Sequence, residues 1–290
     1  MRYWLRGTDV RGNALDAILR ATLLLTLALV MLLAIAAAAC SDVVINDINK
    51  TLSRSEKATL MNLVDKQIRF HRTHYMFREP VVLNIRLFTT NKEFLAYRDK
   101  NPGSKSNTGW YSSKKQEIVV NKTKKEYFQV LLHESQHAIF RVTGTKAPKW
   151  LNEGLSEFFA QSYEESGTVF VKADAGQAKR VKKLLERNKL TPIRTLVNLS
   201  DKGWDSQFKA NNFKYYAECW SLIYFLMVDK QSRQRHDLVN ILRDLNKGSK
   251  HSTFDAINRR YPGGIAALER DWHAFIGSSN FNMKVRYQTY

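Results

Sequence analysis

The chain has 290 residues, of which 44% are hydrophobic, 11% aromatic and 25% charged. It can therefore bury a sizeable core, and its composition excludes a disordered or collagen-like chain. Its 46 lysines and arginines outnumber 27 aspartates and glutamates, which gives a formal net charge of +19. A charge this large makes nucleic acid, anionic lipid or an anionic polymer a candidate partner. The two cysteines, Cys40 and Cys219, do not support a disulfide framework.

Residues 1–40 are expected to be an export leader. Four arginines, the last of them Arg20, precede an uncharged run from Ala21 to Ala39, and a basic flank before an apolar run is typical of signal peptides. The small residues before Cys40 resemble a bacterial lipobox, which predicts a lipidated Cys40. Cleavage after an Ala-x-Ala site and an uncleaved transmembrane anchor are the alternatives.

Each alternative sends the rest of the chain out of the cytoplasm, into the bacterial cell envelope. Export makes nucleic acid an unexpected partner, and no nucleic-acid-binding motif occurs in the sequence. Removing the four arginines and two aspartates of the leader lowers the net charge only from +19 to +17. The positive charge therefore belongs to the exported part of the chain.

Residues 44–290 are expected to form one domain of the α+β class with two lobes. A small N-terminal mixed α/β lobe would carry the active-site helix, and the pattern from residue 122 almost to the end predicts a helical C-terminal lobe. The strand expected in the first lobe alternates Leu83, Ile85 and Leu87 with polar residues. The elements predicted before residue 122 are a helix over 55–71 and strands over 81–88, 110–111 and 117–120.

A His-Glu-Ser-Gln-His motif occupies residues 133–137. In a helix, His133 and His137 lie one turn apart on the same face, where both imidazoles can bind one zinc ion. Glu134 lies about 100° round the helix and can act as a general base on a water at the metal. Residues Thr123–Glu126 have the form of a capping box, which predicts that the helix begins there. The alternative is a surface helix with two unrelated histidines.

A second helix is predicted over residues 150–159. Glu153 and Glu157 lie four residues apart on one of its faces, where two carboxylates repel each other unless a cation lies between them. A metal ion beside Glu153 would relieve that repulsion. Gly154 lowers helix stability by about 1 kcal/mol relative to alanine, which suggests that its missing side chain lets this helix approach the histidine helix closely.

The first motif followed by Pro-x-Trp-Leu-Asn-Glu-Gly at residues 148–154 resembles the gluzincin zinc metallopeptidases of the MA clan. The resemblance is closest to the bacterial peptidase-MA-like family of unknown function, and Tyr216–Leu226 is similar to that family's back helix. It implies a zincin-like fold with a catalytic core over about residues 80–165.

The resemblance also implies roles for individual residues. His133, His137 and Glu153 match the ligands of a zinc cofactor, Glu134 matches the catalytic base, and Glu157 matches an acid that orients the His133 ring. Only fifteen residues separate His137 from Glu153, fewer than in the gluzincin peptidases. Glu157 would fit the longer spacing and is the alternative third ligand.

A hydrolase of this type needs a second hydrogen-bond donor for the oxyanion. Tyr216 fits the family's back helix best, although core packing explains it as well. The other candidates are Tyr215, His236, His251 and His273. A basic stretch over residues 177–189 reads as a solvated helix face or as a contact for anionic lipid or polymer.

Together these features predict a zinc-dependent metallopeptidase-like hydrolase of the bacterial cell envelope. Its expected partners are a peptide or protein substrate, a membrane reached through the lipid or the N-terminal anchor, and an anionic envelope polymer. The alternative function is that of a non-catalytic envelope protein, which binds an anionic polymer or another partner through its basic surface.

Overall fold

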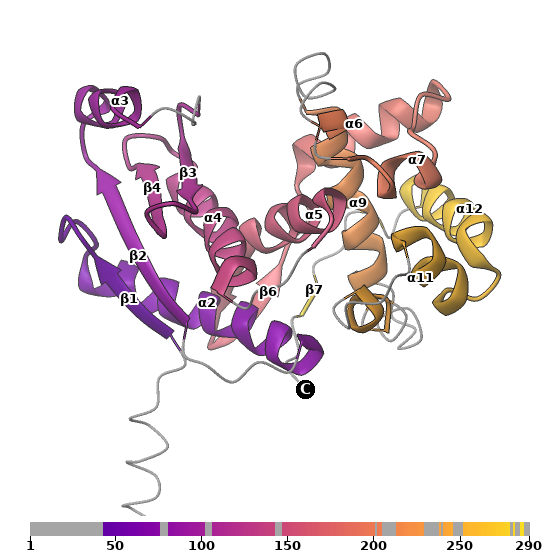
Figure 1. Cartoon of the computed structure of the whole chain (residues 1–290), viewed down its shortest axis with the longest axis horizontal. Coiled ribbons are helices and arrows are strands. Elements are labelled where there is room, and N and C mark those ends of the chain that lie inside the picture. Colours follow the sequence, from indigo (N-terminus) through magenta and orange to yellow (C-terminus); the bar gives the residue numbers. More distant parts are fainter. Residues whose placement is uncertain are drawn as a thin grey trace, which may run out of the picture. The chain divides into compact units, whose positions relative to one another are not determined.

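Two hydrophobic cores organise the part of the chain that the computed structural model describes (Figure 1). One core lies between a sheet and two helices, and the other lies within a group of helices, so the mixed α+β class is confirmed. The predictions for residues 1–40, with Cys40, lie outside the described residues, and so do those for His236 and His251. The structure describes residues 43–75, 81–101, 106–142, 147–200, 202–204, 213–228, 238, 240–245, 252–278, 281 and 285–286.

The first core is built on a four-stranded sheet with the strand order β1-β2-β4-β3. β1 pairs in parallel with β2, β2 pairs in parallel with β4, and β3 runs antiparallel to β4 at the edge. The elements of this lobe are β1 (Val43–Asp47), α2 (Arg54–Tyr75), β2 (Val81–Phe88), α3 (Asn91–Asp99), β3 (Gly109–Ser112), β4 (Glu117–Asn121) and α4 (Tyr127–Val142).

The alternation along β2 decides which helices cover which face of the sheet. Leu83, Ile85 and Leu87 are fully buried and pack with α2 and α4 in one core, as the sequence predicts. On the other face, Phe94 of α3 contacts Phe88 with a ring separation of 6.1 Å. The helix with the histidine motif is therefore fixed against the buried face of the sheet.

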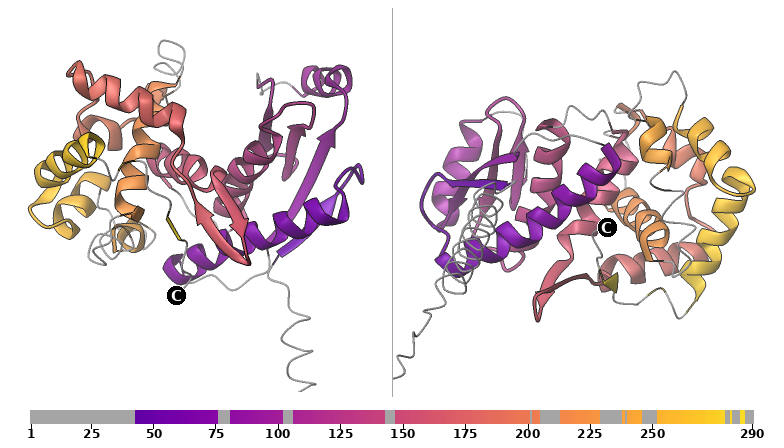
Figure 2. Two further views of the ribbon diagram at one scale, coloured as in Figure 1. Left: turned by 180° about the vertical axis from the view of Figure 1, so that it is seen from behind. Right: turned by 90° about the horizontal axis from the view of Figure 1, so that it is seen from below.

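The second core is formed by helices, together with a small three-stranded sheet ordered β5-β6-β7. Two further views show these helices beside the sheet lobe rather than on it (Figure 2). Residues 43–290 nevertheless form one compact unit. The elements of this lobe are α5 (Lys149–Ala160), β5 (Ser162–Glu165), β6 (Thr168–Val171), α6 (Ala175–Glu186), α7 (Ile193–Val197), α9 (Lys214–Val228), α11 (Thr253–Arg260), α12 (Gly264–Gly277) and β7 (Val285–Arg286).

The expectation of continuous helix after residue 122 was wrong at the hairpin of β5 and β6. Ser166 and Gly167 connect the two strands, and both have positive φ angles, of 50° and 74°. A two-residue loop with φ positive at both positions is the turn that matches the twist of an antiparallel pair. A Ser-Gly pair is a weak signal for a turn, and the short strands contain few positions at which apolar and polar residues could alternate. The local pattern therefore did not predict the hairpin.

The predicted capping box at Thr123 was also wrong. The Thr123 hydroxyl donates to Asn121 Oδ1 at 2.7 Å, and the chain makes turns until α4 begins at Tyr127. The Thr123 hydroxyl is therefore hydrogen-bonded to the Asn121 side chain instead of capping the helix. The histidines remain well inside α4.

Gly154 permits a close helix contact, but with α9 rather than with α4. A Cβ at this position would lie 2.7 Å from Ile223 Cγ1 and 2.8 Å from the carbonyl oxygen of Cys219. Cys219 is fully buried at that contact. Because α5 is seated directly on the α9 backbone, the carboxylates of α5 are held in place by the helical core.

Among the described residues, no helix is long and apolar enough to cross a membrane. The apolar run of Ala21–Ala39 lies outside that part of the chain.

A partly exposed ionic network joins the start of α2 to the segment that leads into α4. Glu56 accepts a hydrogen bond from the Ser53 amide at 2.7 Å and one from Lys122 Nζ at 2.9 Å, and it also bonds to the Tyr127 hydroxyl. Burial alone would raise the pKa of Glu56, but these hydrogen bonds lower it to about 2. The ionised Glu56 therefore stabilises the folded state.

We expect Glu56→Gln to reduce the free energy of unfolding at pH 7 by about 1–2 kcal/mol, after allowance for screening at a partly exposed site. A carboxyl group with a depressed pKa contributes its full stabilisation at pH values above its unfolded-state pKa. That stabilisation is lost as pH falls toward about 2. The stability difference between wild type and variant should therefore shrink as pH falls from 4.5 to 2 in denaturant titrations. Glu126→Gln, at an exposed position near α4, is the control and should change little.

Candidate metal centre

Helix α4 places two imidazoles side by side at the junction of the two lobes. Its Leu131, Leu132 and Ile139 are fully buried in the sheet core, which turns the opposite side of the helix outward. There the Nε2 atoms of His133 and His137 lie 3.2 Å apart, and the two side chains are 15% and 18% exposed. The one-turn spacing thus brings both rings to one point.

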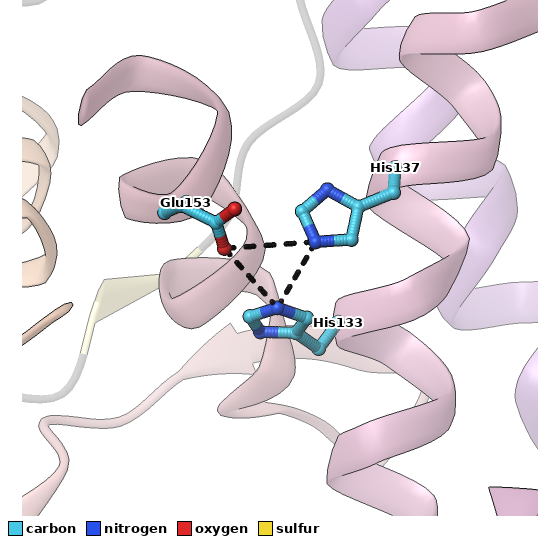
Figure 3. Close-up of side chains that lie close together, drawn as sticks. All are labelled: His133, His137 and Glu153. Atoms are coloured by element: carbon cyan, nitrogen blue, oxygen red, sulfur yellow. Dashed lines mark hydrogen bonds and ion pairs between the residues drawn. The ribbon is translucent and has the colours of Figure 1, made fainter. Parts of the chain in front are cut away.

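Helix α5 supplies a carboxylate to the same point. Glu153 Oε2 lies 3.6 Å from His133 Nε2 and 3.6 Å from His137 Nε2. The three side chains converge from two neighbouring helices (Figure 3). Their atoms form a nearly equilateral triangle of two nitrogens and one oxygen.

The triangle fits a tetrahedral zinc ion. Zinc bonds to histidine nitrogen and carboxylate oxygen of roughly 2.0–2.2 Å imply ligand atoms about 3.3–3.6 Å apart. The two separations of 3.6 Å fall within that range, and the 3.2 Å between the two nitrogens lies just below it. In addition, Glu153 Oε2 is buried and has no hydrogen-bond partner among the described residues. A buried carboxylate oxygen in that situation is costly unless a cation binds it.

The outer nitrogen of each imidazole is held by an acceptor on α5. His133 Nδ1 lies 3.3 Å from Glu157 Oε1, and His137 Nδ1 lies 2.9 Å from Asn152 Oδ1. A proton on Nδ1 leaves the Nε2 lone pair facing the centre of the triangle, which is the arrangement that metal-binding histidines use. Glu157 thus lies behind His133 instead of beside Glu153.

Further side chains fix these partners. Ser156 Oγ lies 3.3 Å from His137 Nδ1, and Gln177 Nε2 donates to Glu157 Oε2 at 2.6 Å. The sequence did not predict these roles for Asn152, Ser156 or Gln177. Asn152 and Ser156 could have been found from the helical wheel, since they flank Glu153 on the side that faces α4. Gln177 could not, because its contact depends on the packing of α6.

Charge around the triangle keeps Glu153 ionised. Burial alone would raise the pKa of Glu153, but His137, His133 and Lys149 lower it well below its usual range. Lys149 Nζ lies 3.6 Å from Glu153 Oε1, the oxygen that faces away from the histidines. For His133 the directions are reversed. Burial alone would lower its pKa, but Glu153 and Glu157 raise it above its usual value. A proton and a metal cation therefore compete for the His133 ring.

Glu134 and Tyr216 lie close to the triangle. The Glu134 side chain is buried, and its charge is among the causes that raise the pKa of His133. Burial raises the pKa of Tyr216, and so do the charges of Glu153, Glu157 and Glu134. The phenol is therefore within the electrostatic reach of three carboxylates at the site. Its ring also contacts Trp204 at a centroid distance of 5.6 Å.

The other described oxyanion candidates, Tyr215 and His273, have different surroundings. Burial and the charge of Glu218 raise the pKa of Tyr215, and its hydroxyl is coupled to Thr191. These contacts belong to the side of α9 where the Thr191 amide donates to Glu218 at 2.7 Å. His273 lies on α12, which packs on α6, α7, α9 and α11. Of the described candidates, Tyr216 is the one whose charge environment includes the metal-site carboxylates.

Comparison with known proteins finds similarity to a family of unknown function. A family model described as a protein of unknown function (DUF1570) matches residues 128–252. The matched segment contains His133, Glu134, His137 and Glu153, and also Tyr216. No curated protein matches the chain.

We expect Asn152→Ala to weaken zinc binding by about 10–100-fold, because His137 would lose the acceptor that holds its Nδ1 proton. Competition with a chromophoric chelator measures the affinity. Asn152→Asp retains an acceptor oxygen at the same position and should bind zinc nearly as well as wild type. Equal affinity of wild type and Asn152→Ala would show that this contact does not orient the ring.

Proposed function

We propose that the protein is a zinc-dependent metallopeptidase-like hydrolase of the bacterial cell envelope that cleaves a peptide or amide bond. The observation that carries the proposal is the triangle of His133, His137 and Glu153 with separations of 3.2 and 3.6 Å. Two neutral nitrogens and one carboxylate are the donor set of catalytic zinc sites, which keep a fourth position open. The fit to the gluzincin pattern, and to a zincin-like architecture, belongs to this proposal.

Zinc bound there supplies a Lewis acid that polarises a carbonyl and makes water a stronger acid. His133 and His137 would hold it through Nε2, and Glu153 would hold it through Oε2. Glu157 and Asn152 keep the two rings oriented from behind. The carboxylate of Glu153 reduces the positive charge at the site but leaves it net positive.

Glu134 has the position of a general base. It follows His133 on α4, is buried, and has its charge next to the His133 ring. As the nucleophilic water attacks, the Glu134 carboxylate accepts its proton and then donates that proton to the leaving amine. A buried carboxylate with little solvent around it performs both transfers without competition from bulk water.

Tyr216 is the donor that the oxyanion requires. A phenol is protonated at neutral pH, and here burial and three nearby carboxylates raise its pKa further. A protonated hydroxyl can donate a hydrogen bond as negative charge develops on the carbonyl oxygen. It thereby offsets charge that the cation alone would have to stabilise.

The location in the envelope rests on the leader in residues 1–40. A lipidated Cys40, or an uncleaved anchor, would keep the enzyme at the membrane surface. Mass spectrometry of the mature protein tests this part of the proposal separately, since a lipoprotein begins with an acylated Cys40.

We expect Glu134→Gln to keep about one zinc ion per chain and to reduce kcat by a factor of about 10²–10⁴, because the amide cannot accept the proton. Elemental analysis measures the zinc content. Turnover of a library of internally quenched peptides measures the loss of kcat. Glu186→Gln, at an exposed position of α6, should match wild type. A wild-type protein without zinc would instead favour the non-catalytic alternative.

Tyr216→Phe should reduce kcat by about 10²-fold or more while zinc content and KM change little, because the lost hydrogen bond forms only in the transition state. Tyr215→Phe is the matched control, since the neighbouring hydroxyl is coupled to Thr191 and Glu218. If both variants retain full kcat, Tyr216 serves only the core.

A further inference from the structure

The cations of the basic stretch at residues 177–189 take no part in the candidate metal centre, and the structure shows how they are arranged. Helix α6 begins at a side-chain cap, where Asp174 Oδ1 accepts from the Gln177 amide at 2.9 Å. Ala178 and Val181 bury one side of the helix in the helical core. The rest of the helix surface and the turn that follows carry six cations, which we call the α6 basic face: Lys179, Arg180, Lys182, Lys183, Arg187 and Lys189.

The charges of the α6 basic face are not neutralised within the described part of the chain. None of the six forms an ion pair there, and Glu186 is the one acid within the stretch. Some arginines elsewhere are paired, for example Arg260, which lies 2.9 Å from Asp244, and Arg86, which lies 3.1 Å from Glu117. Six unpaired cations on one surface repel one another and attract an external anionic surface.

An exposed aromatic side chain lies next to these cations. Phe213 is 56% exposed, more than any other exposed large hydrophobic among the described residues. The guanidinium of Arg180 lies 5.7 Å from the centre of its ring. Aromatic rings beside basic residues are typical of protein surfaces that sit at the headgroup level of a membrane. A dissolved polyanion would neutralise the charges but would offer this ring no apolar phase.

We propose that the α6 basic face docks on an anionic phospholipid bilayer, with its lysines and arginines at the headgroups and Phe213 in the interfacial region. Each cation near such a surface contributes about a five-fold gain in binding. The contact is electrostatic, so salt weakens it. It does not depend on the metal centre, and loss of zinc would leave it intact.

The test measures the protection of individual lysines from chemical labelling. Overall binding to vesicles is not informative, because the leader of the full chain can hold the protein on any vesicle. The full chain is reconstituted into phosphatidylcholine vesicles with and without phosphatidylglycerol and treated with an amine-reactive reagent. Mass spectrometry then compares the labelling of Lys179 and Lys183 with that of Lys125, an exposed lysine of the other lobe. We expect at least a five-fold fall in labelling of the α6 lysines on anionic vesicles alone, reversed by high salt.

Variants of the same full chain separate charge from apolar contact. Arg180→Gln combined with Arg187→Gln should remove most of the protection. Lys92→Glu combined with Lys114→Glu removes more positive charge from exposed positions of the sheet lobe, and it should retain the protection. Phe213→Ser should weaken protection on vesicles and leave unchanged any protection by a soluble polyanion. Circular dichroism of each variant confirms the fold.

Equal labelling of Lys179 and Lys183 on neutral and anionic vesicles would overturn the proposal. Protection by a soluble anionic polymer, with none on anionic vesicles, would also overturn it and would assign the α6 basic face to a polymer.

Discussion

Three polar atoms from two helices lie within 3.6 Å of one another, and most of the structure serves to hold them there. Bringing two imidazole nitrogens and a buried carboxylate oxygen together is costly unless they share a cation or a proton. Their meeting requires α4 and α5 to keep one relative register. His133 contacts Glu157 and His137 contacts Asn152, so the two helices run in opposite directions past the site.

Each of the two helices is fixed by a different core. α4 buries its apolar side against the sheet, whereas α5 is seated on α9 through Gly154. The candidate metal centre therefore lies where the two lobes meet, and each lobe contributes part of it. The same helical core brings Gln177 to Glu157 and Tyr216 to the carboxylates. A side chain at position 154 would disturb the site without touching any ligand.

Local patterns predicted the elements that carry strong periodicity. The alternation over residues 81–88 and the helical spacing over 55–71 correspond to β2 and α2. The patterns failed where contacts between distant residues override them. The hairpin of β5 and β6 depends on two residues with positive φ, and β1 is a strand because it pairs with β2. Helix α4 begins at Tyr127 and not at the predicted capping box, because the Thr123 hydroxyl donates a hydrogen bond to the Asn121 side chain.

The sequence by itself determined the large positive charge and the histidine pair, since a spacing of four residues within a helix fixes two side chains on one face. It also placed two glutamates on the next helix but left open which of them joins the histidines. Only the tertiary structure decided between them, because the register of α5 against α4 brings Glu153 Oε2 to both Nε2 atoms and Glu157 to the far side of His133. Such a register depends on packing across two cores, and no local pattern encodes it.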